Sequence, residues 1–110
     1  MNRTLTLRLM NTPGRAEIAR QAVIALAVRA GMPPLAADRA GSNVGSVVAA
    51  CDGADLSILA EIGPSGADLT LIGGDDGWRR EAVAALDAYG ARTDADAVAL
   101  RLARTPLRPV

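Results

Sequence analysis

The residues best suited to chemistry lie in an acidic loop flanked by glycines. Asp75 and Asp76 are adjacent, with Gly73-Gly74 before them and Gly77 after them. Two carboxylates in such a loop could bind a divalent cation or accept hydrogen bonds from a ligand amine. They could also form a solvated turn whose negative charge stabilises the start of the following helix. The spacing alone favours the turn.

Three residues that follow this loop are candidates for a protein-interaction site. Trp78 stands next to Arg79 and Arg80, and Trp and Arg are enriched among the residues that dominate binding energy at protein interfaces. Trp78 could equally lie in the core, with the two arginines on a solvated edge. The sequence leaves both interpretations open.

Several common catalytic groups are absent from the sequence. There is no His, which excludes Ser-His-Asp and Cys-His nucleophiles and histidine phosphotransfer. There is no Lys, which excludes a P-loop lysine, a Schiff base and a pyridoxal phosphate anchor. The single cysteine, Cys51, cannot form a usual zinc site without His and is typical of a small core residue. These absences favour binding over catalysis, and neither a metal nor a cofactor is expected from them.

The charge pattern narrows the class of partner. All 12 basic residues are Arg, they are scattered along the chain, and the formal net charge is zero. Nucleic acids and acidic membranes attract basic patches, so neither is expected as a partner. No segment approaches the ~20 apolar residues of a membrane span, and the N-terminus lacks the apolar run of a signal peptide. A cytoplasmic location is therefore expected.

The elements that must position the acidic loop follow from hydrophobic periodicity. Alternation of polar and apolar residues predicts four strands, at 4–10, 55–62, 67–73 and 96–103. Apolar stripes at three- and four-residue spacing predict helices at 13–31 and 34–51, and a shorter third helix that ends at Gly90. This order is typical of an α+β fold, a two-layer sandwich with helices on one face of a mainly antiparallel four-stranded sheet. We expect one domain over residues 1–104 and a loose tail over 105–110.

Local signals refine the first two helices. Thr12 could cap the first helix, with Pro13 at its first position and Gly31 as its left-handed C-terminal residue. Gly41 and Gly45 lie inside the second helix, where each costs about 1 kcal/mol relative to Ala. These two glycines either allow close approach to a neighbouring element or make room for a ligand.

The element order and several residues resemble the histidine-kinase-like ATPases. The first helix is led by a proline and ends in Arg-Ala-Gly-Met-Pro at 29–33, and Asp75-Asp76-Gly77 follows the second hairpin strand. Within that superfamily the chain is similar to the small anti-sigma-factor serine kinases of bacterial partner-switching systems. There the Asp of a D-x-G-x-G loop recognises the adenine amino group. The resemblance therefore implies a vestigial nucleotide site that includes Asp75 and Gly77.

The chain departs from that family at the positions that carry its chemistry. The family's second helix places a catalytic Glu and, four residues later, a magnesium-binding Asn on one face, and its spacing puts Asn43 and Val47 at these positions. Asn43 cannot act as a general base, and Val47 cannot bind magnesium. Arg79 replaces the second glycine of the loop, and no room remains for the lid that covers the nucleotide. The resemblance therefore implies a truncated member with Asn43 in a vestigial site, without kinase activity and without its ATP–magnesium contacts.

Three functions remain at the level of the sequence. The first is a regulatory protein-binding domain similar to an anti-sigma factor, a homodimer whose partner is a sigma factor or an anti-sigma antagonist, as the resemblance implies. The second is a nucleotide-binding anti-sigma factor of the same fold, in which the shortened site still holds adenine. The third is a small-ligand or structural module unrelated to the superfamily.

Overall fold

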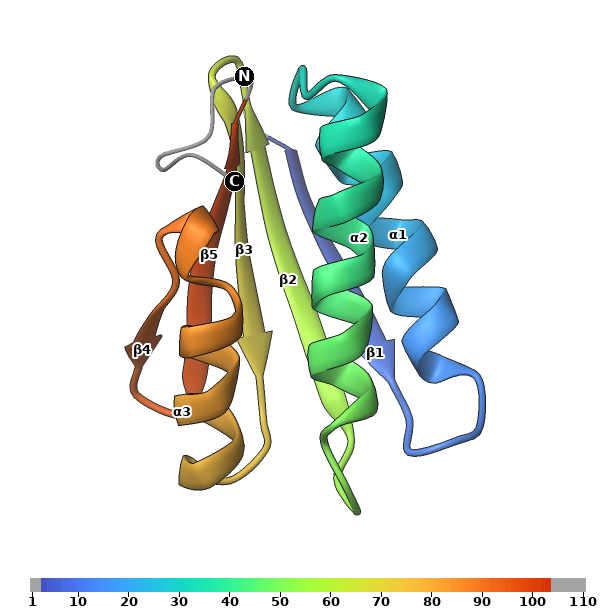
Figure 1. Ribbon diagram of the computed structural model, residues 1–110, viewed down its shortest axis with the longest axis vertical. Helices are drawn as coiled ribbons and strands as arrows, with labels where there is room; N and C mark the ends of the chain where they lie inside the picture. Colours follow the sequence, from blue (N-terminus) through green and yellow to red (C-terminus); the bar gives the residue numbers. More distant parts are fainter. Residues whose placement is uncertain (1–2, 104–110) are drawn as a thin grey trace.

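The computed structural model describes residues 3–103 and shows an α+β fold (Figure 1). In chain order its elements are β1 (Arg3–Leu9), α1 (Arg15–Arg29), α2 (Pro34–Ala49), β2 (Leu56–Gly63), β3 (Gly66–Ile72), α3 (Asp76–Ala85), a 3₁₀ turn η1 (Asp87–Tyr89), β4 (Arg92–Asp94) and β5 (Ala97–Ala103). The predicted tail, 105–110, lies outside the described residues. Within the described residues, none of the helices combines the length and the apolar character needed to cross a bilayer.

The sheet has five strands in the order β1-β2-β3-β5-β4, and all neighbours are antiparallel. The four predicted strands are confirmed within a residue or two. The prediction of four strands is nevertheless wrong, because β4 forms a fifth strand at one edge. All three residues of β4 are exposed, so no hydrophobic alternation marks them, and pairing with β5 creates the strand.

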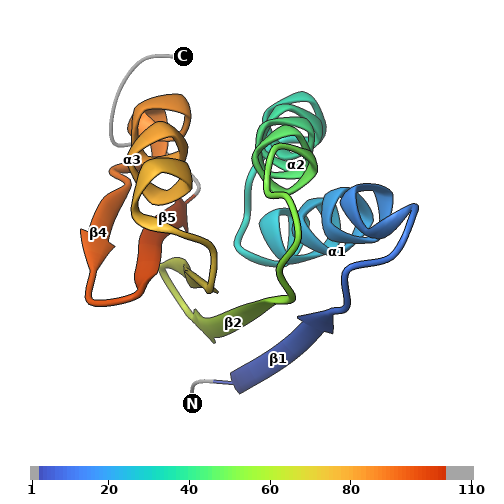
Figure 2. The same ribbon diagram turned by 90° about the horizontal axis from the view of Figure 1, so that it is seen from below.

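Alternation along the strands gives the sheet one apolar face. The register aligns Leu7 with Ile58, Ile58 with Leu71, and Leu71 with Val98. Because side chains opposite each other point to the same side, these pairs form a continuous apolar row. All the helices lie on this inner face (Figure 2), as predicted: α1 over the β1–β2 half, α3 over the β5–β4 half, and α2 beside them, farther from the sheet.

The start of α1 differs from the prediction. The helix begins at Arg15, two residues later than Pro13, and Gly14 is its N-cap residue with a left-handed φ of 86°. Thr12 does not cap, since its hydroxyl donates to the carbonyl of Met10 at 3.4 Å. A left-handed residue interrupts the helical backbone, and glycine adopts it without steric cost. The far end agrees with the prediction, since Gly31 has a φ of +91° just after the helix.

The two glycines inside α2 allow close contact with α1. A Cβ atom at Gly41 would lie 2.4 Å from Ile24 Cγ1 and 2.8 Å from the carbonyl oxygen of Arg20. At Gly45 it would lie 3.3 Å from the carbonyl oxygen of Ala16. Helix-to-helix approach is therefore the correct one of the two interpretations. It leaves the opposite side of α2 to face α3.

Arg15 fixes the lower end of this helix pair. Its side chain is only 6% exposed, and its guanidinium donates to the backbone carbonyls of Cys51 and Ala54. These contacts tie the first turn of α1 to the segment between α2 and β2. A buried guanidinium is tolerated where its N–H groups find acceptors, so Arg15 holds the two helices in a fixed relation.

Candidate functional site

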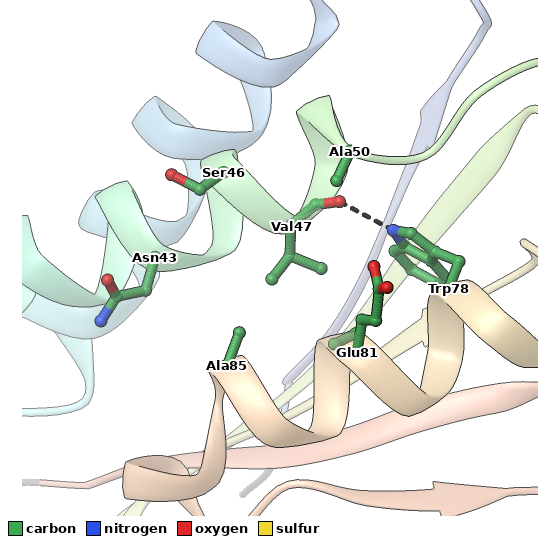
Figure 3. Close-up of a pocket in the computed structure, with 8 residues that line it drawn as sticks. Asn43, Ser46, Val47, Ala50, Trp78, Glu81 and Ala85 are labelled. Atoms are coloured by element: carbon green, nitrogen blue, oxygen red, sulfur yellow. Dashed lines mark hydrogen bonds between the residues drawn. The ribbon is translucent and has the colours of Figure 1, made fainter.

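A groove between α2 and α3 brings together residues from the two regions that the sequence singled out. This α2–α3 groove has a volume of about 220 Å³ and is lined by Asn43, Ser46, Val47, Ala50, Trp78, Glu81, Ala82 and Ala85. Figure 3 shows that α2 supplies one wall and α3 the other. Of the six predicted site residues, Asn43 and Trp78 meet here.

Trp78 closes one end of the groove. Its indole N–H donates to the backbone carbonyl of Val47 at 2.8 Å (Figure 3), and the side chain is only 7% exposed. Gly74, with a φ of +72°, lies against the ring, since a Cβ atom there would be 2.3 Å from Trp78 Cε3. Trp78 is therefore a core residue that joins α3 to α2, which settles the two interpretations of its position in favour of the core.

Asp75 caps α3. Its Oδ1 accepts a hydrogen bond from the backbone N–H of Trp78 at 2.7 Å, the contact that an N-cap aspartate makes with the third helical residue. Gly77 lies in the first turn, and a Cβ atom there would meet only Asp75 Oδ1, at 3.5 Å. The acidic loop thus forms the turn and cap that its spacing favoured, and Asp75 and Gly77 lie beside the groove without lining it.

The two arginines after Trp78 have different surroundings. Arg79 is partly buried and folds back over the loop, donating to the carbonyls of Gly73 at 3.0 Å and Gly74 at 2.6 Å and pairing with Asp76. Arg80 is exposed on α3. Neither lines the α2–α3 groove. Arg79 holds the glycine loop under Trp78, and Arg80 remains available at the surface.

Asn43 and Val47 occupy successive turns of the groove wall. Asn43 Nδ2 donates to the hydroxyl of Tyr89 at 3.1 Å, which links α2 to η1. Val47 is buried, and its side chain points into the space between the helices (Figure 3). The α2 wall therefore offers one amide and one aliphatic group where the resemblance would place a base and a magnesium ligand.

Two polar residues that line the groove, Ser46 and Glu81, were not predicted from the sequence. Ser46 lies three residues after Asn43 on α2, and Glu81 lies three residues after Trp78 on α3. Residues three apart share a helix face, so this spacing was the signal that could have found them. Glu81 lines the groove together with Trp78 and Val47 (Figure 3). A negative group thus stands over a largely apolar groove.

The groove can bind but offers little for catalysis. Its lining contains no nucleophile paired with a base, and residues 3–103 contain no cluster of three His, Cys, Asp or Glu side chains that could hold a metal ion. Cys51 is buried nearby, and burial raises the pKa of its thiol. A raised thiol pKa lowers the thiolate fraction at neutral pH, so Cys51 is suited to packing.

No protein-family model matches the chain, and no curated protein matches its sequence.

Proposed function

We propose that this chain is a regulatory protein-binding domain similar to an anti-sigma factor, in which kinase activity is lost. The observation that carries the proposal is the position of Trp78, whose indole occupies the end of the α2–α3 groove and bonds to α2. The remaining volume, about 220 Å³, is below the roughly 300–1,000 Å³ typical of sites for small molecules and cofactors.

The contacts of Asp75 support the same conclusion. In the ATPases that the chain resembles, the corresponding carboxylate accepts a hydrogen bond from the adenine amino group, whereas Asp75 here accepts one from the backbone N–H of Trp78. Asp75 is exposed to solvent. A hydrogen bond to a charged group strengthens when water is excluded, so an exposed carboxylate offers adenine little. These contacts support binding of a protein partner over binding of a nucleotide.

The partner surface is the rim of the α2–α3 groove together with the exposed side of α3. Asn43, Ser46 and Glu81 provide polar groups around Ala50 and Ala85, and Arg80 lies on the same helix as Glu81. An apolar centre with a polar rim is the usual composition of a protein interface. A side chain with an apolar stem and a cationic end, such as Arg or Lys, fits this lining. The resemblance adds a sigma factor or an anti-sigma antagonist as partner, and a homodimer.

Nucleotide titration tests the loss of the ATP site. Calorimetry with ATP, ADP and adenosine, each with and without magnesium, should show no binding, or weak binding that is nearly equal for all three. Asp75→Ala should leave the result unchanged, because the carboxylate caps a helix. Micromolar binding of ATP that requires magnesium would overturn the proposal in favour of a nucleotide-binding anti-sigma factor.

Partner binding is tested with purified sigma factors and anti-sigma antagonists from the source organism. Glu81→Arg reverses the charge in the groove and should weaken binding at least about tenfold, the equivalent of 1.4 kcal/mol. Thr93→Arg on β4, outside the proposed surface, serves as the matched control and should bind as the unmodified protein does. Absence of binding to every candidate, or equal effects of the two substitutions, would contradict the proposed partner surface.

A further inference from the structure

The strand β1 leaves a long edge of the sheet open. In the described part of the chain it has one neighbouring strand, β2, with which all seven of its residues pair. The opposite edge is formed by β4, which has three residues. A long edge strand presents unpaired N–H and C=O groups and is a template for another strand, whereas a very short one is not.

An apolar groove runs beside this open edge. This β1–α1 groove has a volume of about 330 Å³ and is lined by Leu5, Thr6, Leu7, Ala22, Ala25, Leu26, Arg29, Ile58 and Ala60. Leu5 is 50% exposed although it lies on the inner face of the sheet, and Ile18 of α1 is 53% exposed. In Figure 2, β1 and α1 lie at the same side of the molecule, with no other element beyond them among the described residues.

We propose that a second copy of this chain pairs with β1 in the antiparallel direction, with the two-fold axis at Thr6. This register lets all seven strand residues pair and places Leu5 opposite Leu7 of the second copy on the inner face. Thr6 then faces Thr6 of the second copy on the outer face. The two sheets would form one ten-stranded sheet, since each copy contributes five strands.

The same axis suits α1. Thr6 lines the same groove as Ala22 and Ala25, so an axis through Thr6 passes close to the middle of α1. Antiparallel α1 helices would place Ala22 opposite Ala25 of the second copy, and Ile18 opposite the aliphatic stem of Arg29. Small residues allow helices to approach closely, and the approach would cover the exposed side of Leu5. One occupant thus covers the open strand and the apolar groove together.

Strand length and charge together favour this register over those centred on nearby residues. Arg8 of the second copy would lie opposite Thr4, which itself pairs with Glu61 of β2. Two strand spacings of about 4.8 Å put Arg8 of the second copy roughly 10 Å from Glu61 between Cα atoms, within reach of two long side chains. An axis at Arg8 would oppose the two arginines, and an axis at Leu5 or Leu7 would pair only five residues of each strand. The arrangement centred on Thr6 pairs all seven and sets Arg8 against Thr4.

This interface gives a location to the homodimer included in the proposed function, and in that respect it rests on that proposal. It uses the sheet edge opposite the α3 side of the molecule and leaves the α2–α3 groove free. Self-association and partner binding are therefore measured separately, and failure of either leaves the other standing.

Sedimentation equilibrium of the full chain tests the interface. The unmodified protein should be a dimer. Thr6→Glu and Thr6→Lys each place like charges opposite one another across the axis, which destabilises a strand pair, and each should raise the dissociation constant at least about tenfold. Thr93→Glu on β4 carries the same change to the other edge and should remain dimeric. Circular dichroism should show that all three variants keep the unmodified fold.

Mixing gives the decisive result. The Thr6→Glu and Thr6→Lys proteins, each monomeric alone, should form a one-to-one heterodimer when combined, because opposite charges then face each other at the axis. If the unmodified protein is a monomer, the proposal is wrong. This holds also if β1 then pairs with a strand of a different protein. A dimer that persists in Thr6→Glu, or the absence of a heterodimer on mixing, would overturn it equally.

Discussion

Trp78 joins the two walls of the groove through a single buried hydrogen bond to the Val47 carbonyl. Trp78→Phe keeps most of the ring but leaves that carbonyl without its donor. The free energy of unfolding should fall by about 1–3 kcal/mol, the cost of an unsatisfied buried group. Urea denaturation followed by circular dichroism measures it.

Tyr89→Phe is the matched control for this substitution. It removes the hydroxyl that accepts from Asn43, but the Asn43 amide lines the open groove and can bind water instead. The loss of stability should therefore be smaller than for Trp78→Phe. If the free energy of unfolding falls equally in the two variants, the Trp78 hydrogen bond does not stabilise the protein more than the Asn43–Tyr89 hydrogen bond does.

The side chains around Glu17 lower the pKa of its carboxyl group. Hydrogen bonds from Arg20 at 2.6 and 2.9 Å, and one from Gln21 at 3.0 Å, lower the pKa of its carboxyl to about 2. A carboxyl with a lowered pKa stabilises the folded state at pH values above its unfolded pKa near 4.5. That contribution is lost as the pH falls toward 2. The effect on stability is small because the pair is exposed to solvent.

The direct measurement is an NMR titration of the Glu17 side chain. Its midpoint should lie near 2 in the unmodified protein, and Arg20→Gln should raise it toward the ordinary value of 4.5. If the midpoint of Glu17 is the same in Arg20→Gln as in the unmodified protein, the hydrogen bonds from Arg20 do not cause the lowered pKa.

At the scale of elements, the contact between α1 and α2 discriminates between two glycines. Gly41→Ala brings a methyl group against the Arg20 carbonyl, which is backbone and cannot move cheaply. Gly45→Ala requires a shift of only a few tenths of an ångström. Each change gains about 1 kcal/mol of helix propensity. Gly41→Ala should still lose about 1–3 kcal/mol of stability through overpacking, and Gly45→Ala should stay within ~1 kcal/mol of the unmodified protein.

Denaturant unfolding of the two variants side by side measures this difference. Because both carry the same substitution on the same helix, propensity cancels between them and the difference reports packing against α1. If Gly41→Ala were the more stable variant, the close approach of the two helices at Arg20 would be wrong.

Elements with a strong hydrophobic pattern could be predicted from the sequence, and those made by pairing could not. The stripe of Ala37, Ala40, Val44 and Val48 in α2 is fully buried, and alternation located β2, β3 and β5. By contrast β4 consists of Arg, Thr and Asp, which carry no apolar signal. The start of α1 was misplaced because the Thr12-Pro13 pair satisfies a local rule that the left-handed Gly14 overrides.

The candidate site was predictable in part for the same reason. Residue types and spacing marked Asn43, Asp75 and Trp78, and the structure places Asn43 and Trp78 in one groove with Asp75 beside it. Sequence could not decide whether Trp78 is exposed, since that depends on how far α3 lies from α2. Glu81 and Ser46 belong to no recognisable sequence motif. They become candidate site residues only because α2 and α3 face each other and both residues line the groove between them.

For the whole molecule, the two sheet edges should differ in amide hydrogen exchange. Amides of β2, β3 and β5 lie between two strands and should exchange slowest. In a dilute, monomeric sample both edge strands should exchange fast. Above the dissociation constant of the proposed dimer, β1 should become protected while β4 stays fast. Equal behaviour of β1 and β4 at all concentrations would count against the β1 interface.

The burial of Cys51 makes the protein well suited to site-specific labelling. Its side chain is 5% exposed, burial raises its thiol pKa, and the sequence contains no other cysteine. A maleimide at neutral pH should therefore react slowly with the native thiol, because the thiolate is the reacting species. A cysteine introduced at an exposed position such as Thr93 could carry a fluorophore or spin label without removing Cys51 first. Distances across the assembled protein could then be measured in an otherwise unmodified chain.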